Sequence, residues 1–427
     1  MSEGRTSADR ARPQAGRLVR NAVALMISSG GTAVLGVVFW GIAAHLASTT
    51  AVGRTSAEIA AMMLLANIAQ LSFGMVFERF LPVAGRRTRA LVVRAYSLCV
   101  SFALVAASVY VWSGLANRFL PVGVVWRILF VVIVASWTIF VLQDSALVAL
   151  RASRWVPVEN IFFALAKLAL LPVLVVASGA QGIFLAWSAP VGVTIIAVSI
   201  YLFKWRIPAH EATSLPSGSM PSMREIGLLT LAQYATFLLS MFTPTIVSLI
   251  VLQRMGAVAN AHYYLPALVA NGLGLFLWNI ASPFIVEAAM EPESLRRHAL
   301  TAMRTGAAVL IPCIVIGVVF APLLLRVFGA TYEAHGTTLL RMLLLALPGS
   351  AVTIFYTAFA WLDQRLVPLV IRQLIIAIAY FAIVLVFIGR FGLLSVGIAS
   401  LVTAGLQAVI FLPILIRRIR SIGVPLQ

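Results

Sequence analysis

Acidic residues are scarce in this sequence, which has 13 aspartates and glutamates against 31 lysines and arginines in 427 residues. Charged residues of either sign make up 10% of the chain and apolar residues 62%, which is too little polar surface for a soluble protein. The two cysteines, Cys99 and Cys313, each lie in an apolar run and lack the partner spacing of a metal or redox site. Phosphate-binding loops, zinc-protease motifs and nucleophile elbows are also absent. We therefore expect no enzyme, no metal and no cofactor.

What the chain has in abundance is long apolar runs. Runs of roughly 20 residues, enough to cross a ~30 Å hydrocarbon layer, recur along its whole length. Because a bilayer tolerates no unpaired backbone, such runs must be helices. The sequence therefore predicts an all-α integral membrane protein with twelve transmembrane helices, at 18–46, 57–83, 91–114, 126–150, 157–178, 182–204, 226–252, 261–287, 300–326, 336–362, 367–388 and 393–416.

The net charge of +18 has a topological explanation. Counting cations at the helix ends with the adjoining connection or tail, 23 belong to the tails and the even-to-odd connections and 6 to the odd-to-even connections. Positive residues stay on the cytoplasmic side, so both termini are predicted to be cytoplasmic, in a cytoplasmic (inner) membrane. No nucleic-acid-binding motif accompanies the basic residues, and we expect no nucleic-acid partner.

The predicted helices divide into two halves. A stretch rich in Pro, Ser and Gly near the middle of the chain reads as a flexible cytoplasmic linker. The predicted units are a basic tail (1–17), an N-terminal six-helix lobe (18–205), the linker (206–223), a C-terminal six-helix lobe (224–417) and a cytoplasmic tail (418–427).

The two halves also share a sequence pattern. Arg154-Trp155-Val156-Pro157 opens the fifth run and Arg365-Leu366-Val367-Pro368 the eleventh, 211 residues later. Gly179-x-x-Gly182 and Gly389-x-x-Gly392 follow the same two runs at an offset of 210. An even number of helices per half makes this a parallel repeat, with its axis along the membrane normal and a central cleft between pseudo-symmetric bundles.

Charged residues inside the membrane are costly and therefore mark candidate sites. Asp144 is a candidate proton or cation site, or alternatively a structural partner of Arg151 on the same helix face. Lys167, ten residues into its run, is expected to face the protein interior, either lining the cleft or paired with Glu159. Arg341 is a further candidate for a ligand in the cleft. Alternatively, its side chain extends to the lipid headgroups at the outer face.

The remaining candidates lie nearer the ends of their runs or are uncharged. Arg79, beside Glu78 at the inner end of the second run, and Arg254, at the outer end of the seventh, are either ligands or solvated helix ends. Seven further side chains could line a polar cleft or hydrogen-bond between helices, namely Asn67, Gln70, Gln233, Tyr234, Asn271, Trp278 and Asn279.

Three stretches carry a family resemblance. Gly41 to Arg79 is similar to an opening helical hairpin with a turn at Gly53, and Leu323 to Leu345 carries Gly329, Tyr332 and Arg341 in a matching pattern. The third is the Arg turn and Gly-x-x-Gly pair around the fifth and eleventh runs. Together these stretches resemble the polysaccharide (oligosaccharidyl-lipid) flippases, the Wzx-like branch of the multidrug/oligosaccharidyl-lipid/polysaccharide exporter superfamily.

The resemblance implies two rocking bundles that pass an undecaprenyl-diphosphate-linked oligosaccharide from the inner to the outer leaflet for surface polysaccharide biosynthesis. Its implied partners are that glycan, membrane lipids, a polysaccharide polymerase and other envelope-assembly proteins. The diphosphate would be held by cations, in the order Lys167, Arg341, Arg79 and Arg254, with Asp144 as the coupling-ion candidate. The alternatives are a drug or small-molecule cation antiporter of the same superfamily and a non-transporting scaffold in envelope assembly.

Overall fold

The computed structural model describes residues 31–213, 223–290, 295–363 and 366–421. Over these residues the chain is helical with short turns, and no strand occurs among them. The predicted all-α class is confirmed.

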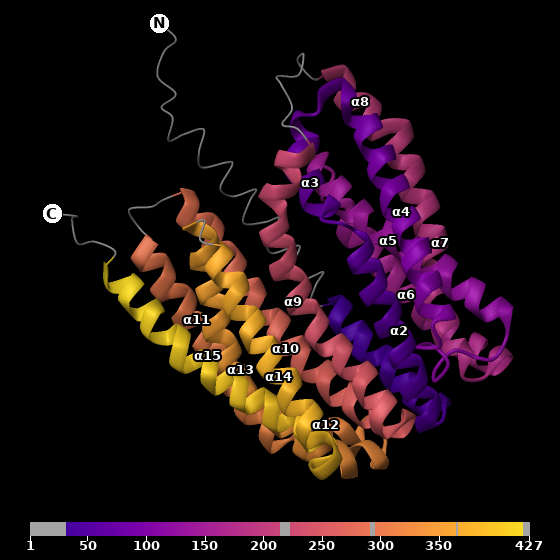
Figure 1. The fold of residues 1–427 in the computed structure, drawn as a ribbon, viewed down its shortest axis with the longest axis vertical. Helices are drawn as coiled ribbons and strands as arrows, with labels where there is room; N and C mark the ends of the chain where they lie inside the picture. The colour runs from indigo at the N-terminus through magenta and orange to yellow at the C-terminus, as the bar shows by residue number, and fades with distance from the viewer. Residues whose placement is uncertain (1–30, 214–222, 291–294, 364–365, 422–427) are drawn as a thin grey trace, which may run out of the picture.

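The first half of the chain forms one bundle, the N-terminal lobe, shown in indigo to magenta in Figure 1. After a helix over Gly31–Leu46, its elements are α2 (Thr49–Ala69), α3 (Phe73–Phe80), the 3-10 turns η1 (Leu81–Val83) and η2 (Gly85–Arg87), α4 (Thr88–Trp112), α5 (Val124–Ala149), α6 (Trp155–Ser178), α7 (Gln181–Tyr201), the π-helical turn η3 (Leu202–Arg206) and α8 (Ile207–Thr213).

The second half forms the C-terminal lobe, shown in salmon to yellow in Figure 1. Its elements are α9 (Met223–Met255), α10 (Ala257–Met290), α11 (Leu295–Val319), α12 (Ala321–Arg326), α13 (Ala330–Leu362), α14 (Leu366–Phe391) and α15 (Leu394–Ser421). Helix α13 packs on α10 and α15, and α14 packs on α15 and α9.

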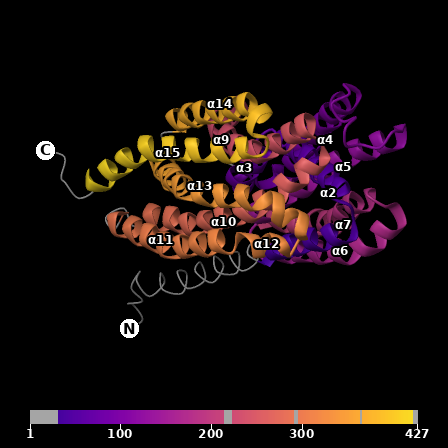
Figure 2. The same ribbon diagram turned by 90° about the horizontal axis from the view of Figure 1, so that it is seen from below.

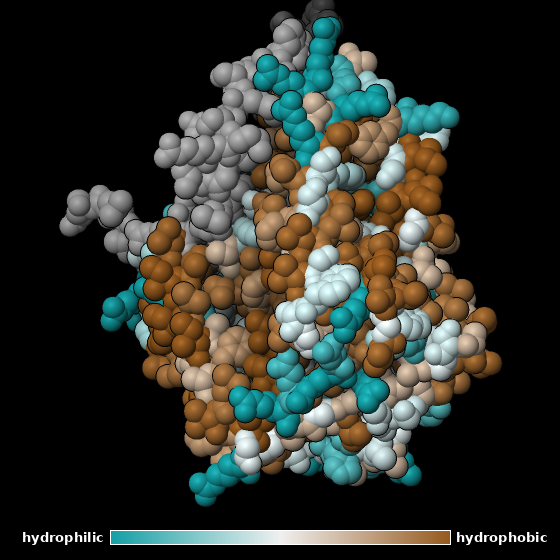
Figure 3. Space-filling model, turned by 45° about the vertical axis from the view of Figure 1, so that its right-hand side comes forward, coloured by the Kyte–Doolittle hydropathy of each residue, from teal (hydrophilic) through white to brown (hydrophobic). Residues whose placement is uncertain are grey.

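The described helices account for twelve spans. Eight are long and apolar enough to cross a membrane, or nine when the bent pair α2–α3 counts as one span. The helix over Gly31–Leu46, together with α9 and α10, brings the described spans to twelve in two bundles. Figure 3 shows apolar side chains over much of one face, as a lipid-facing surface requires, with hydrophilic side chains at its ends and in an oblique band across its lower half.

The second span is broken where the sequence predicts one continuous helix. Leu71 and Ser72 have φ values of 48° and 65°, and α2 and α3 meet at 48°. The break frees carbonyl groups at the end of α2, and the hydroxyl of Tyr234 on α9 donates to two of them, Asn67 O at 2.6 Å and Ile68 O at 2.9 Å. A partner from the other lobe thus satisfies the interrupted backbone.

Two other connections differ from the predicted boundaries. Helices α9 and α10 are separated by Gly256 alone, whose φ of 89° suits glycine and turns the chain back at once. The first part of the predicted linker is helical, because α8 buries Ile207 and is tied to α4, where Glu211 Oε1 accepts from the backbone N–H of Arg89 at 2.9 Å. Residues 214–222 lie outside the described part.

The helix starts keep the sequence offset of the internal repeat, whereas the glycine turns that follow these helices have a different offset. Helices α6 and α14 begin at Trp155 and Leu366, which keeps the predicted offset of 211. The glycine with positive φ is Gly179 after α6 (59°) and Gly392 after α14 (55°), so these two turns are 213 residues apart. The glycine pairs used in the sequence comparison are therefore not equivalent in backbone geometry, because α14 continues past Gly389 to Phe391.

The two lobes meet chiefly through α2 and α3 against α9 and α10. Figures 1 and 2 both show α9 beside α2 and α3, between the two bundles. We call the end of the molecule that carries the α9–α10 turn the Gly256 end, and the opposite end, which carries α8, the α8 end.

Candidate functional site

Lys167, at the middle of α6, lies in a cage of aromatic rings. Its ammonium Nζ lies 3.6 Å from the ring centroid of Trp187 on α7, 5.0 Å from that of Phe163 and 5.4 Å from that of Phe39. Lys167 is 5% exposed, and no acidic side chain among the described residues forms an ion pair with it. Cation–π attraction to three rings takes the place of a counter-ion for this charge.

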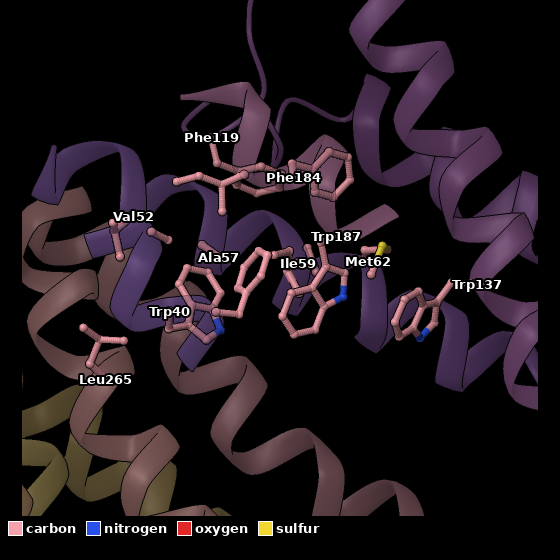
Figure 4. Close-up of a cluster of buried hydrophobic side chains, with 14 of the residues drawn as sticks. Trp40, Val52, Ala57, Ile59, Met62, Phe119, Trp137, Phe184, Trp187 and Leu265 are labelled. Atoms are coloured by element: carbon pink, nitrogen blue, oxygen red, sulfur yellow. The ribbon is translucent and has the colours of Figure 1, made fainter. Parts of the chain in front are cut away.

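This aromatic cage continues to the contact between the lobes. Trp40 packs against Trp187 at 6.1 Å and against Tyr264 of α10, in the other lobe, at 4.7 Å. Figure 4 shows Trp40 and Trp187 close together within the apolar cluster. Lys167 is therefore one layer of rings away from the lobe contact, and its assignment to the cleft stays a prediction.

Asp144 and Glu159 face each other across the α5–α6 pair. Their carboxyl groups are within hydrogen-bonding reach of one another, and Asn160 lies beside Asp144. Glu159 is 6% exposed, while Asp144 is half-buried. Neither of the two partners weighed from sequence is found, since Asp144 makes no ion pair with Arg151 and Glu159 makes none with Lys167.

Glu58 is the second buried acid of the N-terminal lobe. The predicted run starts at residue 57, which would leave Glu58 at the outer end of a helix, but α2 begins earlier, at Thr49, and Glu58 is fully buried. Neither carboxylate oxygen has a hydrogen-bond partner among the described residues. The misplaced helix start hid this residue from the sequence analysis.

The three candidate arginines are all exposed. Arg341 Nε donates to Val318 O on α11 at 3.0 Å, and Arg79 lies over the ring of Phe80 at 5.6 Å. Arg254 lines an open depression of about 380 Å³ together with Gly114, Leu115, Arg118 and Gln253. Arg118, from the turn after α4, donates to Gln253 O, so this depression lies between the lobes at the Gly256 end.

The polar candidates are partly brought together. Gln70 Nε2 donates to Asn67 Oδ1 at 2.8 Å beside the break in the second span, where Tyr234 also binds. Asn271 is exposed on α10. The side chains of Gln233, Trp278 and Asn279 lie outside the part of the chain that the structure describes.

A polar clasp that the sequence analysis missed joins the lobes at the Gly256 end. Asn260 Nδ2 on α10 donates to Gly53 O at 2.8 Å and to Ser56 Oγ at 3.1 Å, both on α2. Ser248 Oγ on α9 donates to Asn260 Oδ1 at 2.9 Å. A Cβ added at Gly53 would stand 1.7 Å from Ala257 O, so only glycine allows this approach. The predicted helix bounds hid this contact, because they leave Gly53 in the turn between 18–46 and 57–83 and Asn260 just before the run at 261–287.

No cluster of three or more histidine, cysteine, aspartate or glutamate side chains that could hold a metal ion occurs among the described residues. The arrangement instead offers buried carboxyl groups in the N-terminal lobe, a caged ammonium and a polar contact between two lobes.

Comparison with solved structures shows what this arrangement resembles. The inward-facing conformation of a multidrug resistance MATE family transporter of the MOP superfamily matches with a TM-score of 0.63 and 15% identity, over 92% of this chain and 95% of that one. The outward-facing conformation of a transporter so described matches at 0.60 and 16%, over 95% and 96%. The eukaryotic MATE transporter AtDTX14 matches at 0.58 and 15%, over 96% and 98%.

No family model and no curated protein matches the sequence. At these identities the structural matches define the fold: a multi-pass membrane protein with the two-lobed helical fold of MATE transporters of the MOP superfamily.

Proposed function

We propose that this protein is a secondary transporter that exports an amphipathic small molecule by alternating access between its two lobes. The observation that carries the proposal is the polar clasp, which joins α2 to α10 at the Gly256 end with only small side chains and two asparagine hydrogen bonds. Such a contact closes one side of the molecule and can separate without unfolding either bundle.

The fold neighbours support the two-state part of this proposal. Solved structures in both an inward-facing and an outward-facing conformation share this fold. With the cytoplasmic termini that the basic residues predict, the Gly256 end faces outward. The present structure then corresponds to the state that is closed on the outside.

The kind of cargo follows from the side chains near the lobe contact. Phe39, Trp40 and Trp187 from the N-terminal lobe meet Tyr264 of the C-terminal lobe, and such aromatic faces bind flat apolar molecules and organic cations. Lys167, the leading diphosphate candidate, is enclosed by the same rings in this state. A drug-like small molecule is therefore our first candidate, and multidrug resistance transporters are among the fold neighbours.

A lipid-linked oligosaccharide is the second candidate, and the exposed arginines favour it. Arg79, Arg254 and Arg341 are solvent-accessible on three different helices, and guanidinium groups bind diphosphates in a bidentate fashion. This cargo is the one that the sequence resemblance implies.

Two transport assays on the purified protein in proteoliposomes separate the candidates. The first follows a fluorescent organic cation under an imposed pH gradient or membrane potential, and the second follows the transbilayer movement of a polyprenyl-diphosphate oligosaccharide. We expect the first to respond and the second to stay at the protein-free rate.

Substituting Trp40→Ala should reduce dye transport, and Trp112→Ala, an exposed tryptophan at the end of α4, is the matched control. If the wild type moves the glycan and not the dye, and Arg79→Ala or Arg341→Ala loses this movement, the second candidate replaces the first. Failure of both assays with folded protein would favour the non-transporting scaffold.

A further inference from the structure

The cytoplasm-proximal half of the N-terminal lobe, as the charge pattern orients it, holds two acidic side chains in one place. Asp144 lies five residues before the end of α5 at Ala149, and Glu159 is the fifth residue of α6. The two helices bring both carboxyl groups to a common point, within hydrogen-bonding reach of each other.

No cation within residues 31–213, 223–290, 295–363 and 366–421 forms an ion pair with either acid. The ion pairs made by the described residues join Arg326 to Glu333 and Arg418 to Asp363, and neither involves Asp144 or Glu159. Neither oxygen of Glu159, nor Oδ1 of Asp144, has a donor within the described residues if both groups are ionised. Two adjacent ionised carboxylates would be prohibitive in energy here, even with the Asn160 amide beside Asp144.

Other polar groups lie around the pair on the helices packed near it. The Tyr96 hydroxyl on α4 is close enough to interact electrostatically with Glu159, and its own oxygen has no partner. Glu78 on α3 accepts from Ser145 at 3.2 Å, and Cys99 on α4 is tied to Gln70 O. Arg206 on η3 donates to Leu150 O and makes no ion pair with either acid.

We propose that Asp144 and Glu159 form a single proton-binding site, in which the O–H of one carboxyl donates to the carboxylate of the other. One shared proton supplies the missing donor and removes one of two like charges, as in other close carboxyl pairs. A metal cation fits less well, because hard cations take six or more oxygen ligands, whereas two carboxyls and the Asn160 amide are what converges here among the described residues.

The site has an entrance and a closed side. Glu159 is 6% exposed, whereas Asp144 is half-buried and one residue before Ser145, which contacts the exposed Glu78. Asp144, the more exposed residue of the two, is the side from which a proton would reach the pair, toward the α8 end. That this exchange accompanies export rests on the proposed function, whereas the existence of the shared proton does not.

Infrared difference spectroscopy of the purified protein tests the proton directly. At neutral pH the wild type should show the carbonyl stretch of protonated carboxylic acid, and part of this band should vanish in the double variant Asp144→Asn/Glu159→Gln. Glu58→Gln is the matched control, because it removes another buried acid of the same lobe and should remove a different part of the band.

Thermal unfolding gives a second readout that a folding defect cannot imitate. A proton held more tightly in the folded protein than in the unfolded chain stabilises the fold at low pH, and this stabilisation is lost as the pH rises. The midpoint of the wild type should therefore fall toward alkaline pH, and that of the double variant should fall less steeply.

A double variant that keeps the whole wild-type acid band overturns the proposal. Sodium-dependent stabilisation at alkaline pH that disappears in the double variant would overturn it in favour of a cation site. In inverted vesicles, pH-driven dye movement should be lost in the double variant. If the wild type itself shows no such movement while the shared-proton band is present, the proposed function fails and the proton site stands.

Discussion

Asn260 on α10 donates a hydrogen bond to the main-chain carbonyl of Gly53 on α2, across the boundary between the two lobes. The bond is 2.8 Å long, both residues are buried, and the absent side chain of Gly53 is what lets the two helices approach. This hydrogen bond helps to hold the lobes together at the Gly256 end, and it can be tested at each of the two residues.

Gly53→Ala should shift the lobes apart at the Gly256 end. The added Cβ would stand 1.7 Å from Ala257 O, and overpacking of this kind costs about 1–3 kcal/mol, enough to change a two-state population roughly tenfold. Spin labels at Leu115 and Met255, which are exposed on opposite sides of the contact, would report a longer distance. Gly192→Ala, where a Cβ meets no neighbour, is the control, and an unchanged distance in Gly53→Ala would contradict the clasp.

Lys167→Met should leave the protein folded and test whether the charge itself is used. The methionine fills much of the same volume, and loss of a desolvated cation–π contact of about 2 kcal/mol is offset by removal of a buried charge. We expect a thermal midpoint near that of the wild type and a strong loss of transport. Equal transport at equal stability would show that the ammonium only fills the aromatic cage.

The ion pair between Asp363, at the end of α13, and Arg418 on α15 should contribute little to stability. Its contribution should depend on the two parallel hydrogen bonds of the guanidinium group. Arg418 donates to both oxygens of Asp363, at 2.7 and 3.0 Å, with both side chains partly exposed. Arg418→Lys keeps the charge but removes the fork, and should lower stability by about 0.5–1 kcal/mol in thermal unfolding. The neighbouring exposed Arg417→Lys should change nothing, and an equal loss there would assign the effect to general surface charge.

The predicted orientation in the membrane can be checked at the linker. A cysteine placed at Ser219, in a background without Cys99 and Cys313, should react with a membrane-impermeant maleimide only after the cells are opened. A cysteine at Asn117, in the turn after α4, should react in intact cells. Labelling of Ser219→Cys from outside would reverse the assignment of the two ends.

The composition and order of the residues determined much of the fold of this protein. Apolar runs of membrane-spanning length and the cost of unpaired backbone in a bilayer are properties of the chain itself, so helix number, class and division into two halves followed from them. The break at Leu71–Ser72 could not be predicted from the sequence. Tyr234, which donates to the freed carbonyls, is more than 160 residues away along the chain.

The site depended on tertiary structure for the same reason. Sequence singled out Asp144 and Lys167 because a charge inside a membrane is costly wherever it points. What neutralises each one is a matter of contact between helices: three aromatic rings from three helices enclose Lys167, and Glu159 rather than Arg151 faces Asp144. The clasp at Gly53 and Asn260 likewise joins residues 207 positions apart, and only the packing of α2 on α10 brings them together.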